Sequence, residues 1–266
     1  PPQTGGPSGS PSLHSIRKPH TMSLPKHGFW MSSPSFAAAE MARLAGYEFI
    51  TLDIEHGAFD LADLERFIPF LKSIGFEVLA KVLGPERGPI QQALDFGADV
   101  VVIPHVLGKT HAEEVCAFTK FPPLGDRSFA GGRTSNYAGF DDAWVAQQNS
   151  KTRCYPMIED HGAVEEIEAI LALPTVDGVF IGPSDLSLRR ERGAYSRKPG
   201  DFDDLAKVAA AARAAGKDWA LPAWSPEEKE FSTKNGASHA VLIMEHGALF
   251  QGLNIAKQTM NEITGK

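Results

Sequence analysis

The feature that most limits the possible folds is a regular alternation of short apolar runs with longer segments of helical periodicity. Helix-closing glycines follow the first three helical segments, at Gly46, Gly75 and Gly97. The apolar runs predict strands at 28–31, 49–54, 78–82, 100–104, 155–158, 178–181, 219–223 and 240–244. The helical segments lie at 36–44, 61–74, 90–96, 112–119, 164–171 and 202–215, near Glu227, and in a closing helix that reaches Ile263.

Eight strands that alternate with helices in 266 residues predict an α/β fold, a (β/α)₈ or TIM barrel. An open doubly wound sheet is the alternative. No glycine-rich phosphate loop follows the first strand, which disfavours the nucleotide-binding form of that sheet.

The domain organisation follows from composition. Residues 1–20 are rich in Pro, Gly and Ser and lack periodicity, so we expect a flexible N-terminal tail ahead of a single barrel domain at 21–266.

Residues 121–149 interrupt the alternation of strands and helices with glycines and aromatic residues. A long irregular stretch inside a compact domain favours a functional loop or lid.

Charge and hydropathy exclude several classes of partner. The formal net charge of −7 argues against a nucleic-acid binder, and no apolar run approaches the length of a membrane span. Cys116 and Cys154 lack metal-ligand spacing and are too few for a disulfide framework. We expect buried thiols in a reducing compartment, and therefore a cytoplasmic protein.

Charged residues gather where barrel strands end, which is where the active sites of this fold lie. They are Asp53, Glu55, His56, Lys81, Glu159 and Asp185. Two carboxylates on neighbouring strand ends suit a hard divalent cation such as Mg²⁺. The Gly182-Pro183 turn indicates a helix start near Asp185, with free N–H groups for an anionic ligand. The alternative is that Glu159 and Asp185 only end a strand and cap a helix.

Three further residues have two interpretations each. His56 is a natural general base, because imidazole titrates near neutrality, but it is also a candidate metal ligand or structural residue. Asp95 either orients this imidazole or ends its helix in solvent. Arg127 either steers an anionic substrate or forms a structural salt bridge.

Several motifs occur in order along the chain: LDIEHG at 52–57, ALDFGA at 93–98, FPPLGDR at 121–127, MIE at 157–159 and DGVFIGPSDLS at 177–187. Together they resemble the HpcH/HpaI family of class II pyruvate aldolases, from about Gly28 to the C-terminus. The last motif is specific, and the others are informative as a set.

The resemblance implies a barrel of the phosphoenolpyruvate-binding superfamily, assembled as a hexamer from dimers that exchange the C-terminal helix. It implies Mg²⁺ or Mn²⁺, with Co²⁺ or Zn²⁺ as other options, on Glu159 and Asp185. The substrate-binding residues that it implies are Gly182, Ser184, Asp185, Lys81 and Arg127, and the base is His56 paired with Asp95. Lys81 stands where the family has an arginine.

The implied activity is a metal-dependent carbon–carbon lyase acting on 2-oxo acids through a metal-bound enolate of pyruvate. One alternative is an oxaloacetate-type decarboxylase. Another is a 2-oxo acid-binding barrel whose chemistry is weakened by Lys81. A Schiff-base aldolase using Lys81 is a further option, which the metal pair makes unnecessary.

Overall fold

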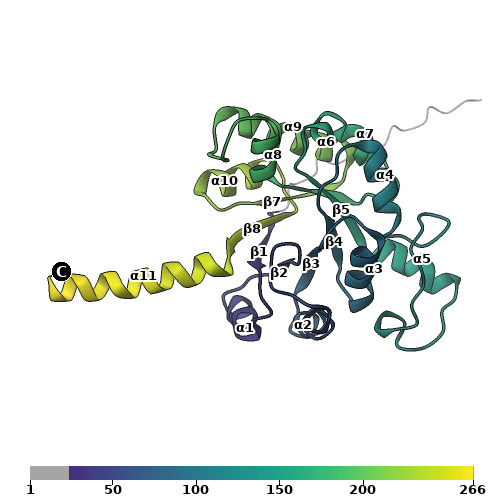
Figure 1. The fold of residues 1–266 in the computed structure, drawn as a ribbon, viewed down its shortest axis with the longest axis horizontal. Coiled ribbons are helices and arrows are strands. Elements are labelled where there is room, and N and C mark those ends of the chain that lie inside the picture. Colours follow the sequence, from purple (N-terminus) through teal and green to yellow (C-terminus); the bar gives the residue numbers. More distant parts are fainter. Residues whose placement is uncertain (1–23, 266) are drawn as a thin grey trace, which may run out of the picture.

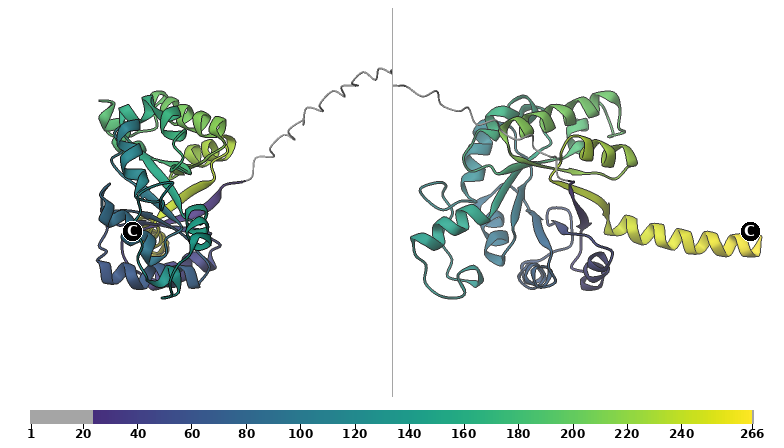
Figure 2. Two further views of the ribbon diagram at one scale, coloured as in Figure 1. Left: turned by 90° about the vertical axis from the view of Figure 1, so that its right-hand side faces the viewer. Right: turned by 180° about the vertical axis from the view of Figure 1, so that it is seen from behind.

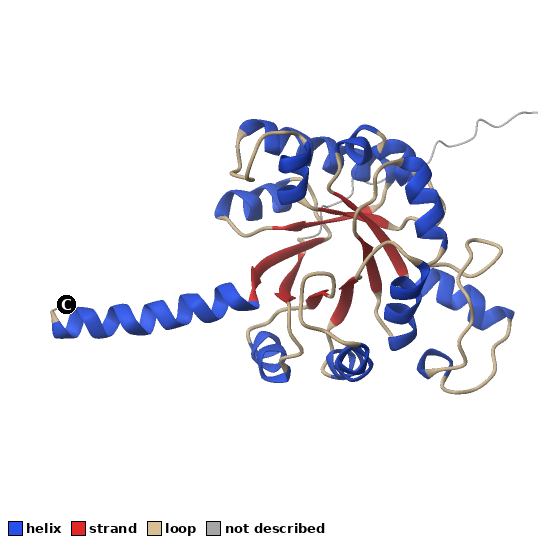
Figure 3. Ribbon diagram, in the orientation of Figure 1, coloured by secondary structure: helices blue, strands red, loops and turns tan. Residues whose placement is uncertain are grey.

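The computed structural model describes residues 24–265, so the predicted tail at 1–20 lies outside the described residues. Eight parallel strands pair in sequence order and close between the first and the last (Figures 1 and 3). The predicted (β/α)₈ barrel is therefore confirmed. Its strands are β1 (Lys26–Met31), β2 (Phe49–Asp53), β3 (Glu77–Lys81), β4 (Val100–Ile103), β5 (Arg153–Ile158), β6 (Gly178–Ile181), β7 (Asp218–Pro222) and β8 (His239–Met244).

Helices follow the strands, and α1, α2, α5, α6 and α10 begin where a side chain accepts a hydrogen bond from a free backbone N–H. Asp60 and Asp63 form a reciprocal capping box that starts the second helix, for example. The helices are α1 (Phe36–Leu44), α2 (Leu61–Ser73), α3 (Arg87–Phe96), α4 (Lys109–Ala117), η1 (Arg133–Ser135), α5 (Asp142–Lys151), α6 (His161–Glu165), α7 (Ile167–Leu171), α8 (Pro183–Arg189), α9 (Pro199–Ala215), α10 (Pro226–Lys234) and α11 (Glu245–Thr264).

Two predicted segments differ from the structure. The stretch at 121–149 was expected to be irregular, but it contains η1 and most of α5. Asp141 caps α5, and Trp144 packs its indole against Phe121 and Phe129, so tertiary aromatic contacts anchor a helix of weak amphipathicity. The single helix expected at 164–171 divides into α6 and α7 at Glu166.

The interior has two apolar layers. One fills the space between the strands and the surrounding helices, and the other fills the barrel itself. Inside the barrel, a Cβ on Gly28 would lie only 2.1 Å from the Phe49 ring, so this position must remain glycine for the ring to enter. Because apolar side chains fill the inside of the barrel, polar side chains can gather only at its two ends.

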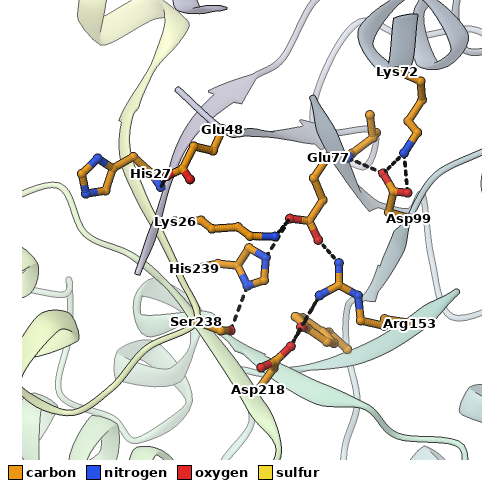
Figure 4. A network of polar contacts seen from close by, with 12 residues as sticks. Lys26, His27, Glu48, Lys72, Glu77, Asp99, Arg153, Asp218, Ser238 and His239 are labelled. Carbon is orange, nitrogen blue, oxygen red and sulfur yellow. Dashed lines mark hydrogen bonds and ion pairs between the residues drawn. The ribbon is translucent and has the colours of Figure 1, made fainter. Parts of the chain in front are cut away.

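The N-terminal end of the barrel is closed by charged side chains from alternate strands (Figure 4). Lys26 pairs with Glu77 at 2.6 Å, Glu77 also pairs with Arg153, and Arg153 lies 3.4 Å from Asp218. His239 is buried beneath them, with its Nε2 3.2 Å from Glu77 Oε2. In (β/α)₈ barrels the N-terminal end contributes to stability, and the active site lies at the other end. We therefore interpret the cluster as structural.

The closing helix α11 leaves the barrel and projects away from it (Figures 1 and 2). Most of its residues are exposed, including several large apolar side chains. Within residues 24–265, no helix combines the length and the apolar character that a membrane crossing requires.

Candidate active site

Lys81 occupies the centre of the charged side chains at the C-terminal end of the barrel. It is the last residue of β3 and is almost fully buried, at 4% exposure. Its ammonium lies 3.1 Å from Asp53 Oδ1 and 2.5 Å from Glu55 Oε2. Trp30 Nε1 donates to the other oxygen of Asp53 at 3.2 Å. Lys81 is therefore a paired cation held between two carboxylates.

Glu55 connects Lys81 to a histidine on the loop after β4. Glu55 Oε1 lies 2.5 Å from His105 Nε2. Burial acts to raise the pKa of Glu55, but the hydrogen bond and charge of Lys81, followed by His105, outweigh burial and lower this pKa. Glu55 thus stays a carboxylate between two nitrogen partners.

Glu159 directly follows β5 and is buried, with 3% exposure. The backbone N–H of His105 donates to Glu159 Oε1 at 2.7 Å. Burial raises the pKa of Glu159, the His105 N–H opposes that rise, and the charge of the neighbouring Asp185 adds to it. The site therefore contains a desolvated carboxylate next to a second one.

Gly182 lets the backbone after β6 pass close to the Glu159 side chain. A Cβ on Gly182 would lie 2.7 Å from Glu159 Oε2 and 2.8 Å from its Cβ. Asp185 lies two residues past Pro183, in the first turn of α8, and is exposed. The expected helix start near Asp185 is thus present.

This donor set fits a divalent cation of the Mg²⁺ type. Such ions bind through one or two carboxylates and otherwise use water and substrate oxygens, so Glu159 and Asp185 suffice. Among residues 24–265, no group of three or more His, Cys, Asp or Glu side chains forms a metal cage of its own. The arrangement favours an ion shared between protein and ligand.

His56 and Asp95, predicted as a pair, have other partners within the chain. His56 is 65% exposed, and its Nε2 lies 3.6 Å from Glu55 Oε2. Asp95, in the last turn of α3, accepts a hydrogen bond from Arg127 at 2.7 Å. Among residues 24–265, the hydrogen bonds and ion pairs include none between His56 and Asp95.

Arg127 forms the salt bridge that is one of its two predicted roles, and its part in substrate binding stays a prediction. The side chain is buried at 3% exposure, and its guanidinium lies over the Phe121 ring, 4.7 Å from the centroid. Burial lowers the pKa of Arg127, and Asp95 opposes that change. Within one chain this arginine links α3 to the segment that follows α4.

Trp30 and His105 are site residues that the sequence interpretation missed. Trp30 is the penultimate residue of β1, and His105 follows Pro104 after β4. Both residues lie at or just after the C-terminal end of a strand, where the active sites of this fold lie. Their positions in the sequence could therefore have indicated them as site residues. His105 also has a positive φ of 58°, which is uncommon for a residue other than glycine.

Comparison with known proteins is consistent with this arrangement. A sequence profile described as HpcH/HpaI aldolase/citrate lyase matches residues 26–241. A 2-keto-3-deoxy-L-rhamnonate aldolase of Klebsiella pneumoniae is 32% identical over 162 residues, which are 60% of each chain. A 2-dehydro-3,6-dideoxy-6-sulfogluconate aldolase of Pseudomonas putida is 31% identical over 160 residues, which are 60% of this chain and 63% of the other.

The match therefore spans less than two thirds of the length of these curated relatives. The crystal structure of an HpcH/HpaI aldolase from Desulfitobacterium hafniense superposes with a TM-score of 0.82 at 26% identity. That superposition covers 90% of this chain and 93% of the other. From the profile match, which extends over most of the barrel, we conclude that this chain belongs to the HpcH/HpaI aldolase/citrate lyase family.

Proposed function

We propose that this protein is a metal-dependent carbon–carbon lyase that cleaves a 2-oxo acid and releases pyruvate. The observation that carries the proposal is the buried Glu159 carboxylate, whose pKa is raised by burial and by the charge of Asp185 beside it. The two relatives named as aldolases of 2-oxo sugar acids support the reaction class.

In this proposal Glu159 and Asp185 hold Mg²⁺ or Mn²⁺, or Co²⁺ or Zn²⁺ in their place. When bound, the ion supplies Lewis-acid stabilisation of negative charge on the substrate ketone oxygen. The N–H groups of Ser184 and Asp185 lie in the first turn of α8, where helix geometry leaves them without an intrahelical acceptor. They are available to the substrate carboxylate beside Gly182.

His56 is the proposed base. Its exposed imidazole lies at the mouth of the barrel and takes the proton of the hydroxyl next to the bond that breaks. Glu55, 3.6 Å away, stabilises the protonated imidazole that results. Lys81 supplies positive charge within the same cluster, and Asp95 with Arg127 supports α3 behind it.

We also propose a cytoplasmic homo-oligomer, a hexamer built from three dimers that exchange α11. Two free, buried cysteines suit a reducing compartment. The exposed apolar side chains of α11 border a groove of about 680 Å³ that α1 lines on its other side. A second copy of α11 would bury these surfaces.

The test uses the purified chain with pyruvate in D₂O and measures deuterium exchange at the methyl group. We expect exchange that requires Mg²⁺ or Mn²⁺ and stops on chelation. Glu159→Gln and Asp185→Asn should each lose about 10³-fold in exchange rate, since several kcal/mol of charge stabilisation disappear.

Calorimetric titration with Mn²⁺ provides an independent measurement, and both variants should bind the ion more weakly. Glu113→Gln, an exposed acid on α4, is the matched control and should behave like the parent. Full exchange after exhaustive chelation would contradict the proposed function.

A further inference from the structure

His105 lies between two groups of charged side chains at the C-terminal end of the barrel. Its ring Nε2 is 2.5 Å from Glu55 Oε1, and Glu55 belongs to the group around Lys81. Its backbone N–H donates to Glu159 Oε1 at 2.7 Å, and Glu159 belongs to the pair proposed to hold the metal. One residue therefore contacts both groups, one through its side chain and the other through its backbone.

The backbone of His105 has a conformation that most side chains avoid. Its φ is 58°, and residues other than glycine adopt positive φ values in only a few per cent of cases. The Cβ atom crowds the neighbouring backbone in this conformation, so it persists only where other contacts hold it. Residues of this kind cluster at functional sites.

The polar contacts that hold His105 are those with the two carboxylates. Within the described part of the chain, His105 forms no hydrogen bond with another backbone group. Its ring contacts Glu55, and its N–H contacts Glu159. Glu55 is itself fixed, because its other oxygen lies 2.5 Å from Lys81 Nζ. The ring is therefore tied to a carboxylate that Lys81 holds in place.

We propose that His105 is a positioning residue of the active site. The bond between its ring and Glu55 keeps the backbone at a positive φ, and this conformation directs the backbone N–H at Glu159. Glu159 is thereby oriented for the divalent ion. The inference rests on the proposed function and adds to it the residue that orients a metal ligand.

A competing role is direct binding of the ion by the imidazole. The ring Nδ1 lies 3.6 Å from Glu159 Oε1, so it is close to the place where the ion would bind. The two roles predict different behaviour for two variants that both lack the ring. Glycine adopts a positive φ without strain, whereas alanine does not. Positioning therefore requires only the backbone conformation, and direct binding requires the imidazole.

The experiment measures the dissociation constant of Mn²⁺ by calorimetry for the parent, His105→Ala and His105→Gly. We expect His105→Ala to bind Mn²⁺ about 10- to 100-fold more weakly, the range typical when the partner of a metal ligand is removed. His105→Gly should bind nearly as tightly as the parent, although it removes more of the side chain.

A second measurement needs no metal. Hydrogen exchange of the residue-105 amide, resolved by mass spectrometry and divided by the intrinsic rate of each sequence, reports the bond to Glu159. This amide should stay protected in the parent and in His105→Gly. It should exchange at least about tenfold faster in His105→Ala, because a hydrogen bond to a charged group is lost.

Glu55→Ala tests the link between the ring and the backbone. It should expose the residue-105 amide as His105→Ala does, and adding His105→Gly to it should restore protection. Tyr137→Ala is the matched control, because Tyr137 also has a φ of 58° and is 73% exposed. This control should leave Mn²⁺ affinity and the residue-105 amide unchanged. Circular dichroism verifies that each variant is folded.

The outcomes separate this inference from the proposed function. Equal loss of Mn²⁺ affinity in His105→Ala and His105→Gly means that the ring binds the ion, and parent affinity in His105→Ala means that His105 positions nothing. Either result overturns this inference alone. The expected order of affinities without metal-dependent deuterium exchange into pyruvate overturns the proposed function alone. A parent that binds no Mn²⁺ overturns both.

Discussion

At the scale of single residues, Lys81 is the buried cation of the candidate site. Its ammonium is committed to Asp53 and Glu55 and is nearly inaccessible to solvent. The positive charge of Lys81 is therefore held in a fixed position. It neutralises one of the two negative charges of Asp53 and Glu55. Removing it would leave both acids buried without a cation, which is costly.

We predict that Lys81→Ala loses at least about 10² in the rate of pyruvate deuterium exchange, as is typical when one stabilising donor is removed. Lys81→Arg should instead match or exceed the parent, because a planar guanidinium can bind Asp53 and Glu55 together. The exchange rate of both variants, with folding verified by circular dichroism, checks this prediction.

An arginine variant as slow as the alanine variant would mean that the reaction requires the amine itself. Borohydride trapping of the parent with pyruvate then tests for a Schiff base on Lys81. If no adduct forms, a decarboxylase that uses a different 2-oxo acid becomes the favoured interpretation.

At the scale of elements, α11 leaves most of its surface exposed within residues 24–265. Its 20 residues extend about 30 Å, and Leu249, Leu253 and Met260 are each more than half exposed. The adjoining groove presents α1 side chains such as Met41, which is 63% exposed. Apolar area of this kind is typical of an interface.

We predict that Leu249→Glu combined with Leu253→Glu dissociates the proposed oligomer. Each leucine side chain contributes about 1.5–3 kcal/mol when fully buried, and a charge reverses that contribution. Size-exclusion chromatography with light scattering measures the mass. Asn254→Glu with Gln258→Glu adds the same charge at polar positions of α11 and serves as the control. A parent that is already monomeric at micromolar concentration would contradict the proposed assembly.

At the scale of the whole molecule, the charged N-terminal end of the barrel makes stability depend on pH. His239 is buried among Lys26, Arg153 and Glu77. Burial lowers the pKa of His239 from 6.5 to about 3, and the charge of Arg153 contributes to this shift. The folded chain therefore keeps His239 neutral at pH values where the unfolded chain protonates it.

Because the pKa is lower in the folded state, the free energy of unfolding should decrease as pH falls below about 6.5. The loss from this one group amounts to about 2 kcal/mol at pH 5. Urea unfolding at pH 7 and pH 5 measures it. His239→Gln should show a smaller difference between the two pH values, whereas His246→Gln, at a position where the histidine side chain is 69% exposed, should retain the parent difference. Equal pH dependence in parent and His239→Gln would contradict this prediction.

The amino-acid sequence by itself determined the barrel and the order of its strands, and it predicted that the chemistry lies at the strand ends. Strand and helix periodicities arise from local backbone geometry, so they can be read along the chain. Glu159 and Asp185 were predicted as metal ligands for the same reason, since each comes after the end of a strand. The family motifs added the reaction class and the expected metal.

Only the tertiary structure decided which charged groups meet. Asp95 binds Arg127 within the chain, Lys81 lies between Asp53 and Glu55, and His105 joins Glu55 to Glu159. These partners are separated by up to 54 residues in the sequence. A hydrogen bond forms or fails within a few tenths of an ångström, and no local pattern encodes the position of a distant side chain to that accuracy. Barrel closure sets those distances, and so it alone selects the partners.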